Sequence, residues 1–180
     1  MGLKSLFPIY KIFEKCVRMD LMKIDIVCVG KIKERFYAAA IDEYGKRLGR
    51  YCQLEIREVP DEKTPDHSSE TEKNRIKAVE GERLLQKLRP DAFVIALAID
   101  GKALTSEDFS RKIEQLGISG VSHIQFVIGG SLGLSEAVFR RADFRLSFSA
   151  MTFPHQLMRV ILMEQIYRGY RIMKGEPYHK

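Results

Sequence analysis

Residues 123–134 read HIQFVIGGSLGL, an apolar run that ends in a glycine-rich turn. Residues 92–99, AFVIALAI, form a second apolar run of similar length. A strand covered on both faces reads as a near-continuous hydrophobic run, which is typical of a parallel sheet between layers of helices. These two stretches predict the central strands of an α/β fold.

The sequence on either side of these runs alternates between strand and helix patterns. Apolar residues at helical spacing predict helices over 34–48, 70–88, 106–116, 135–141 and 155–173. Further strands are predicted over 23–29, 51–59 and 144–148, with a turn at Asp100-Gly101. This order, without a repeat or a linker, predicts one α/β domain with a mostly parallel five-stranded sheet flanked by helices.

Composition narrows the functional classes. The chain has 180 residues, 45% of them hydrophobic, and a net charge of +6, which permits a nucleic-acid partner without proving one. Three cysteines without a CxxC pair argue against a disulfide framework or a cysteine-rich zinc site, and favour the cytoplasm. The four histidines are scattered, and no apolar run reaches the roughly 18–20 residues of a membrane span. We expect neither a metal nor a membrane.

Residues 1–21 are interpreted separately. Their apolar patch is too short and too interrupted for a secretory signal, and Leu6 stands where a myristoylation motif needs Ser or Thr. We expect a poorly ordered extension, or an upstream start codon, with the functional domain spanning residues 22–180.

Ligands of open α/β sheets bind beyond the carboxyl ends of the strands. Three segments are expected there: 97–101, 129–134 and 148–154. The glycines of the second segment fit a binding loop and a tight strand-to-helix turn about equally well. Neither GxGxxG after the first strand nor the GK[ST] of a P-loop is present, so a Rossmann dinucleotide site is unsupported.

The stretch from Leu146 to Arg159, LSFSAMTFPHQLMR, combines a loop rich in apolar side chains with the start of the last predicted helix. That helix is apolar on most of its circumference, which indicates burial on more than one side and, in a chain of this size, a subunit interface. Cations and aromatic residues alternate toward the C-terminus. They suit RNA phosphates and bases, and also fit a solvated basic helix end.

Three stretches closely resemble the RlmH (YbeA-type) family of ribosomal RNA methyltransferases. They are VGKIKERFYAAAIDEYGKRL, FVIGGSLGL and LSFSAMTFPHQLMRVILMEQIYRGYRIMKGEPYHK. The resemblance runs from Met22 to Lys180. It implies the SPOUT class, whose sheet ends in a C-terminal trefoil knot; nothing in the periodicity indicates a knot.

The resemblance also implies an activity. Members methylate N3 of a pseudouridine in 23S ribosomal RNA, using S-adenosylmethionine, as homodimers on assembled ribosomes. Transferred to this sequence, the cofactor pocket comprises Leu97, Gly129, Phe148, Ser149, Ala150, Met151, Thr152 and Phe153. Ala150 stands where close relatives often have a lysine, which matters little if this position contributes backbone atoms.

The implied reaction needs a base and a cation, because the imide proton leaves N3 and an oxyanion develops. His155 or His179 is a candidate base, near the ordinary pKa of about 6.5. Arg159 or Arg168 is a candidate for the anion. Arg159, Arg168, Tyr178 and His179 are candidates for holding RNA and supporting the deprotonation. His155 also fits a plain helix start, and His179 a loose tail. Two rival functions remain: a non-enzymatic ribosome- or RNA-binding module, and an α/β nucleotide-binding enzyme unrelated to RNA.

Overall fold

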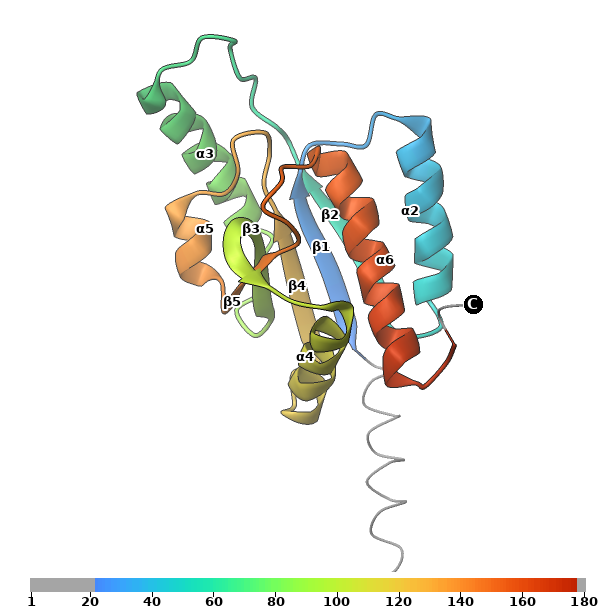
Figure 1. Ribbon diagram of the computed structural model, residues 1–180. Coiled ribbons are helices and arrows are strands. Elements are labelled where there is room, and N and C mark those ends of the chain that lie inside the picture. The colour runs from blue at the N-terminus through green and yellow to red at the C-terminus, as the bar shows by residue number, and fades with distance from the viewer. Residues whose placement is uncertain (1–21, 178–180) are drawn as a thin grey trace, which may run out of the picture.

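The computed structural model describes residues 22–177, and its centre is a five-stranded sheet (Figure 1). All neighbouring strands pair in parallel, in the order β2-β1-β4-β3-β5. The strands are β1 (Lys23–Val29), β2 (Gln53–Val59), β3 (Phe93–Ala103), β4 (His123–Ile128) and β5 (Phe144–Ser147). The α/β prediction with a five-stranded sheet is confirmed, and the first strand of the described chain lies near the middle of that sheet.

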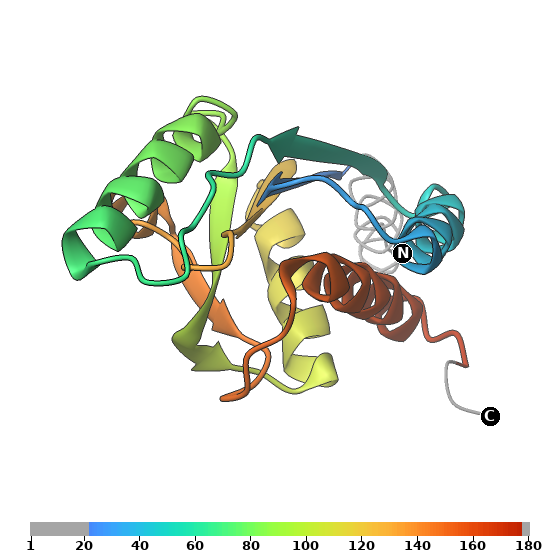
Figure 2. The same ribbon diagram turned by 90° about the horizontal axis from the view of Figure 1, so that it is seen from above.

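Helices cover both faces of the sheet. On one side lie α3 and α5, and on the other lie α2, α4 and α6, as Figures 1 and 2 show from two directions. Their bounds are α2 (Arg35–Leu48), α3 (Glu70–Leu85), α4 (Ser106–Ile118), α5 (Glu136–Arg141) and α6 (His155–Met173). Among residues 22–177, no helix is long and apolar enough to cross a bilayer.

The alternation of side chains along β1 produces two cores. Ile24, Ile26 and Cys28 point into the larger core beneath α2, α4 and α6. Val27 and Val29 point to the opposite face and join the smaller core beneath α3 and α5. A strand with period-two side chains can be apolar throughout only when both faces are buried.

β3 departs from the sequence prediction. Asp100-Gly101 was predicted to be a turn, but the strand continues to Ala103. Leu146 of β5 pairs with both Leu97 and Lys102, so the intervening residues form an irregularity in the strand. A Cβ on Gly101 would lie 2.7 Å from the backbone carbon of Leu146. A dipeptide typical of turns is here used for a close approach of two strands.

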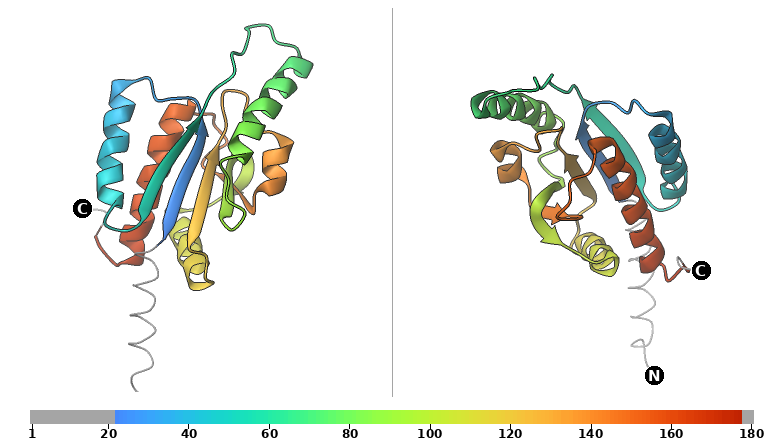
Figure 3. Two further views of the ribbon diagram at one scale, coloured as in Figure 1. Left: turned by 180° about the vertical axis from the view of Figure 1, so that it is seen from behind. Right: turned by 45° about the horizontal axis from the view of Figure 1, so that its top comes forward.

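The end of α3 and the packing of α6 also differ from the prediction. α3 ends at Leu85 rather than Leu88, because the amides of Lys87 and Leu88 bond carbonyls three residues back, as in a tighter last turn. α6 has the predicted bounds, but much of its apolar surface is covered within the chain. It packs against α2 on one side and α4 on the other (Figure 3). The apolar circumference therefore does not by itself require a second subunit.

Phe126 of β4 offers a direct test of the larger core, since its ring is fully buried. Replacing it by Ala should lower the free energy of unfolding by about 3–5 kcal/mol, because the lost contacts leave a cavity. Ile118 is 57% exposed, so Ile118→Ala should change it by less than about 0.5 kcal/mol. Urea unfolding of both variants measures the difference, and equal losses would contradict this packing.

Candidate active site

A cavity of about 580 Å³ opens at the carboxyl edge of the sheet. Its walls come from the ends of three strands and from the loop before α6, so the three segments predicted from the sequence meet around one space. The lining residues are Leu97–Ile99, Ile128–Gly133, Leu146, Phe148, Ser149, Met151–His155 and Met158. This volume lies within the range of small-molecule pockets, about 300–1,000 Å³.

The glycine loop after β4 forms one wall. A Cβ on Gly129 would lie 2.6 Å from the carbonyl carbon of Gly133, and one on Gly130 would lie 2.8 Å from Glu80 Oε2. The amide of Gly133 donates to the carbonyl of Gly130 at 3.1 Å, and Gly133 has a φ of 83°. The loop is therefore both a tight turn and a wall of the cavity. The two interpretations that the sequence left open, a binding loop and a tight turn, do not exclude each other.

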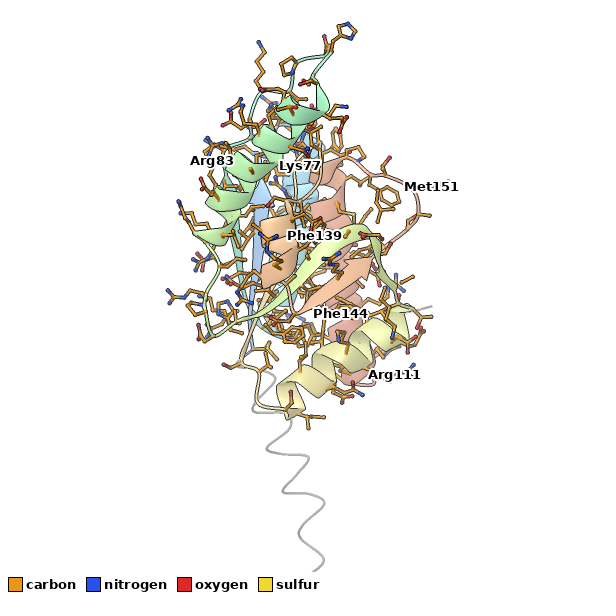
Figure 4. The ribbon with its side chains drawn as sticks, turned by 90° about the vertical axis from the view of Figure 1, so that its left-hand side faces the viewer. Lys77, Arg83, Arg111, Phe139, Phe144 and Met151 are labelled. Carbon is orange, nitrogen blue, oxygen red and sulfur yellow. The ribbon has the colours of Figure 1, made fainter. Side chains whose placement is uncertain are left out.

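The loop from Phe148 to Pro154 forms the opposite wall. Ser149 fixes its turn, because the Ser149 hydroxyl accepts a hydrogen bond from the amide of Met151 at 2.9 Å. Met151 is 73% exposed and stands out from the body of the molecule (Figure 4). Of the eight residues predicted for the cofactor, seven line the cavity; Ala150 does not.

His155 begins α6 and lines the cavity. Its Nε2 lies 3.3 Å from the position that a Cβ on Gly30 would occupy, so the ring rests against the end of β1. Burial lowers the pKa of His155 below its ordinary value of 6.5, and the guanidinium of Arg159 lowers it further, while Asp61 opposes both. The imidazole is therefore neutral at pH 7 and able to accept a proton.

Arg159 lies one turn further along α6 and is fully buried. Its Nη2 donates to the carbonyls of Val29 at 2.8 Å and Gly30 at 2.6 Å, and its Nη1 donates to Glu58 Oε1 at 2.7 Å. A guanidinium bound in this way does not reach an RNA base. In this structure the side chain instead joins α6 to β1 and β2, and the role predicted for Arg159 over an anion stays a prediction.

Arg168 is separated from the cavity. It pairs with Glu164 at 2.6 Å and lies 13 positions after His155, which is about 20 Å along a helix. The structure therefore does not bring Arg168 to the cavity of its own chain. Tyr178 and His179 lie outside the described residues.

The sequence analysis missed part of the site. Ile128, Leu146 and Met158 line the cavity although they lie outside the three predicted segments. It also missed that the end of β1 contacts His155, although Gly30 follows a strand and has a φ of 79°. The carboxyl-edge rule applied to β1 would have found this contact.

Two arginines of α6 make a matched test of these contacts. Arg159→Met should lower the free energy of unfolding by about 3–5 kcal/mol, because Glu58 and two carbonyls lose their donor. Arg168→Met removes a partly exposed pair at i,i+4 spacing and should cost less than about 1 kcal/mol. Urea denaturation distinguishes them; a small loss for Arg159→Met would show that its contacts contribute little.

Comparison with known proteins agrees with the resemblance seen in the sequence. Residues 22–179 match the family model described as "Predicted SPOUT methyltransferase". Ribosomal RNA large subunit methyltransferase H of Bifidobacterium adolescentis is 64% identical over 159 residues, which are 88% of this chain and 100% of that protein. The protein of the same name from Clostridium beijerinckii is 58% identical with the same coverage. The chain therefore belongs to the SPOUT methyltransferase family, and its resemblance to RlmH-type members is confirmed.

Proposed function

We propose that the chain methylates N3 of a pseudouridine in 23S ribosomal RNA, with S-adenosylmethionine as donor and assembled ribosomes as substrate. It does so as a cytoplasmic homodimer. The observation that carries this proposal is one cavity lined by seven of the predicted cofactor residues, in a chain 64% identical to a protein named as a ribosomal RNA large subunit methyltransferase. Incubating the purified protein with labelled cofactor and intact ribosomes tests it.

The cavity fits the proposed cofactor in size and character. Leu97 and Phe148 offer apolar walls, and the close turn at Gly129 leaves backbone groups without side chains in front of them. These residues, with the loop from Ser149 to Phe153, would hold the adenosyl group. When bound, S-adenosylmethionine supplies an electrophilic methyl group on a sulfonium. The chain's own contribution is chiefly to orient the two reactants, which can supply much of a rate enhancement.

His155 is the proposed base for the N3 proton. Its neutral imidazole at the cavity can accept that proton, and the lowered pKa keeps this form populated at neutral pH. Arg159 is a positioning residue, because its buried contacts hold the first turn of α6 against β1. Arg168, Tyr178 and His179 are proposed to hold RNA.

The homodimer is supported by apolar side chains on the outer surface near the cavity. Met151 and Phe153 are exposed beside α6, and a second, smaller cavity includes Phe153 and Ile161. We propose that a second copy packs here and that each subunit contributes C-terminal residues to the site of the other. The proposed catalytic domain is 22–180, with 1–21 unnecessary for transfer, and the trefoil knot remains a prediction from the resemblance.

The rival function is a ribosome- or RNA-binding module that retained the fold without catalysis. Such a module has no need for a ligand-sized cavity at the carboxyl edge. Cofactor binding therefore distinguishes the two functions most directly.

Gly129→Val should abolish detectable cofactor binding, because the new side chain would collide with the backbone of Gly133. Gly45→Ala is the matched control. Gly45 lies within α2, and the nearest atom to its added Cβ would be 4.0 Å away. Calorimetry with S-adenosylmethionine measures both, and unchanged affinity in Gly129→Val would exclude this pocket.

The role of His155 predicts a pH dependence. The group is active when neutral, so the single-turnover rate should fall as pH drops through its pKa, which lies below 6.5. At pH 6.5 more than half of the plateau rate should therefore remain. His155→Gln should reduce the rate by roughly 10²–10⁴-fold and remove this dependence, whereas His67→Gln, in an exposed loop, should not. A retained pH profile in His155→Gln would assign the base elsewhere.

Deleting Tyr178–Lys180 should leave cofactor affinity and folding intact, since three terminal residues add little core. Transfer to ribosomes should drop at least about tenfold, equivalent to roughly 1.4 kcal/mol of transition-state stabilisation. Single-turnover assays at saturating cofactor measure this. Equal rates would mean that these residues are only a solvated end.

A further inference from the structure

The loop that joins β1 to α2 concentrates positive charge beside the cavity. Residues 31–36 read KIKERF, with a net charge of +2, and Lys31, Lys33 and Arg35 are all exposed. Within residues 22–177, no ion pair joins these three cations to a carboxylate. In Figures 1 and 3 the connection from β1 to α2 lies at the same end of the molecule as the start of α6. This charge was not used in the proposed function.

The same loop exposes an aromatic ring. Phe36, in the first turn of α2, is 62% exposed. Its ring centroid lies 4.2 Å from that of Tyr37, with an angle of 54° between the planes. The neighbouring ring supports Phe36 on one side and leaves most of its surface to solvent. An exposed, supported aromatic ring next to several cations is the combination that binds single-stranded nucleic acid.

The backbone of the loop is held by side chains from elsewhere in the fold. Gln156 Oε1 accepts a hydrogen bond from the amide of Lys33 at 2.8 Å, and Glu58 Oε1 accepts one from the amide of Ile32 at 3.2 Å. Glu58 is also the partner of the buried Arg159. The cations thus extend from a backbone already fixed to α6 and β2, so binding needs little ordering of the loop.

The loop lies directly against the proposed base. Gly30, at its start, contacts His155, and Gln156 follows His155 in α6. The charge of Lys33 is one of the influences that lower the pKa of His155. A strand of RNA seated on this loop would therefore pass next to the imidazole and the mouth of the cavity.

We propose that residues 31–36 form the docking surface for the substrate RNA strand. Lys31, Lys33 and Arg35 bind its phosphates, and one unpaired base stacks on Phe36. This rests on the proposed function for the identity of the RNA, but binding to the surface needs no methyl transfer. Unpaired bases present their faces to aromatic rings in a way that a base-paired helix does not, so the segment recognised is single-stranded.

The opposite end of α2 carries cations as well, but in a different setting. Arg47 pairs there with Glu43, and Arg171 pairs with Glu176. Lys46 and Arg50 are exposed, and the end of α2 lies about 20 Å from its start. This far end provides a control with the same charge change.

The test compares binding and catalysis in four variants. One variant, the near-end pair, carries both Lys31→Glu and Lys33→Glu. Its control, the far-end pair, carries both Lys46→Glu and Arg50→Glu. Phe36→Ala is matched by Ile118→Ala, another exposed apolar residue. Fluorescence anisotropy with a labelled single-stranded oligouridylate measures affinity at several salt concentrations. Methyl transfer to intact ribosomes gives KM and kcat, and calorimetry gives the affinity for S-adenosylmethionine.

The near-end pair should bind oligouridylate at least tenfold more weakly at low salt, and the negative slope of log affinity against log salt should become shallower by about 1.4. Phe36→Ala should weaken binding at least about fivefold without changing the slope. In the near-end pair and in Phe36→Ala the KM for ribosomes should rise, while kcat and cofactor affinity stay within a few fold. The two controls should resemble wild type.

An equal loss in the far-end pair would overturn the proposal, because overall charge would explain it. Weaker transfer with unchanged oligouridylate affinity would also overturn it, since the loop would then contact a protein of the ribosome rather than RNA. If wild type binds oligouridylate through this loop but transfers no methyl group, the docking surface stands and the proposed function fails. If wild type transfers and the near-end variants keep both KM and affinity, only the docking surface fails.

Discussion

The site depends on one buried guanidinium. Arg159 gives three hydrogen bonds, to the last carbonyl of β1, to Gly30 and to Glu58 of β2. A buried charge of this kind is stable only when its polar partners are in place, so the ends of the two strands and the start of α6 adopt their positions together. These three hydrogen bonds therefore set the position of His155, of the loop after β1 and of one cavity wall.

The rest of the site follows from parallel pairing. Since every strand of the sheet runs the same way, residues 97–99 within β3 and the residues that follow β4 and β5 meet at one edge. The glycines after β4 then let the backbone fold tightly enough to leave a cavity rather than fill it. Side chains there contribute apolar walls, and the chemistry rests on the few polar groups at the edge.

Much of the fold could be predicted from the sequence, because local patterns and covered strands carry strong signals. β4 and α6 have the predicted bounds. The continuation of β3 through Asp100-Gly101 could not be predicted, because its cause is the backbone of β5, a partner distant in sequence. The same holds for Arg159. Its residue type suits a phosphate or an anion equally well, and only the three-dimensional neighbours show that both of its terminal nitrogens already donate hydrogen bonds.

The cofactor segments were predictable because each lies within or directly after a recognisable strand. The loop after β1 was harder to assign, since its two lysines read as ordinary surface charge. Its meaning comes from Gln156 and Glu58, which hold its backbone from two other elements. Such contacts join residues more than a hundred positions apart in one case, and no local pattern announces them.

Arg159 and its partners at the end of β1 lie far apart in the sequence, and this has a consequence for how the protein folds during synthesis. Arg159 and the carbonyl of Val29 are 130 positions apart, and β1 pairs with β4 across most of the described chain. Contacts of this kind close large loops, which slows folding and leaves strand edges unpaired in the meantime. During synthesis the first strand emerges long before the helix that completes its end. The nascent chain therefore has no finished binding cavity until α6 has left the exit tunnel, and a chain interrupted before α6 keeps its apolar sheet face open to aggregation or to chaperones.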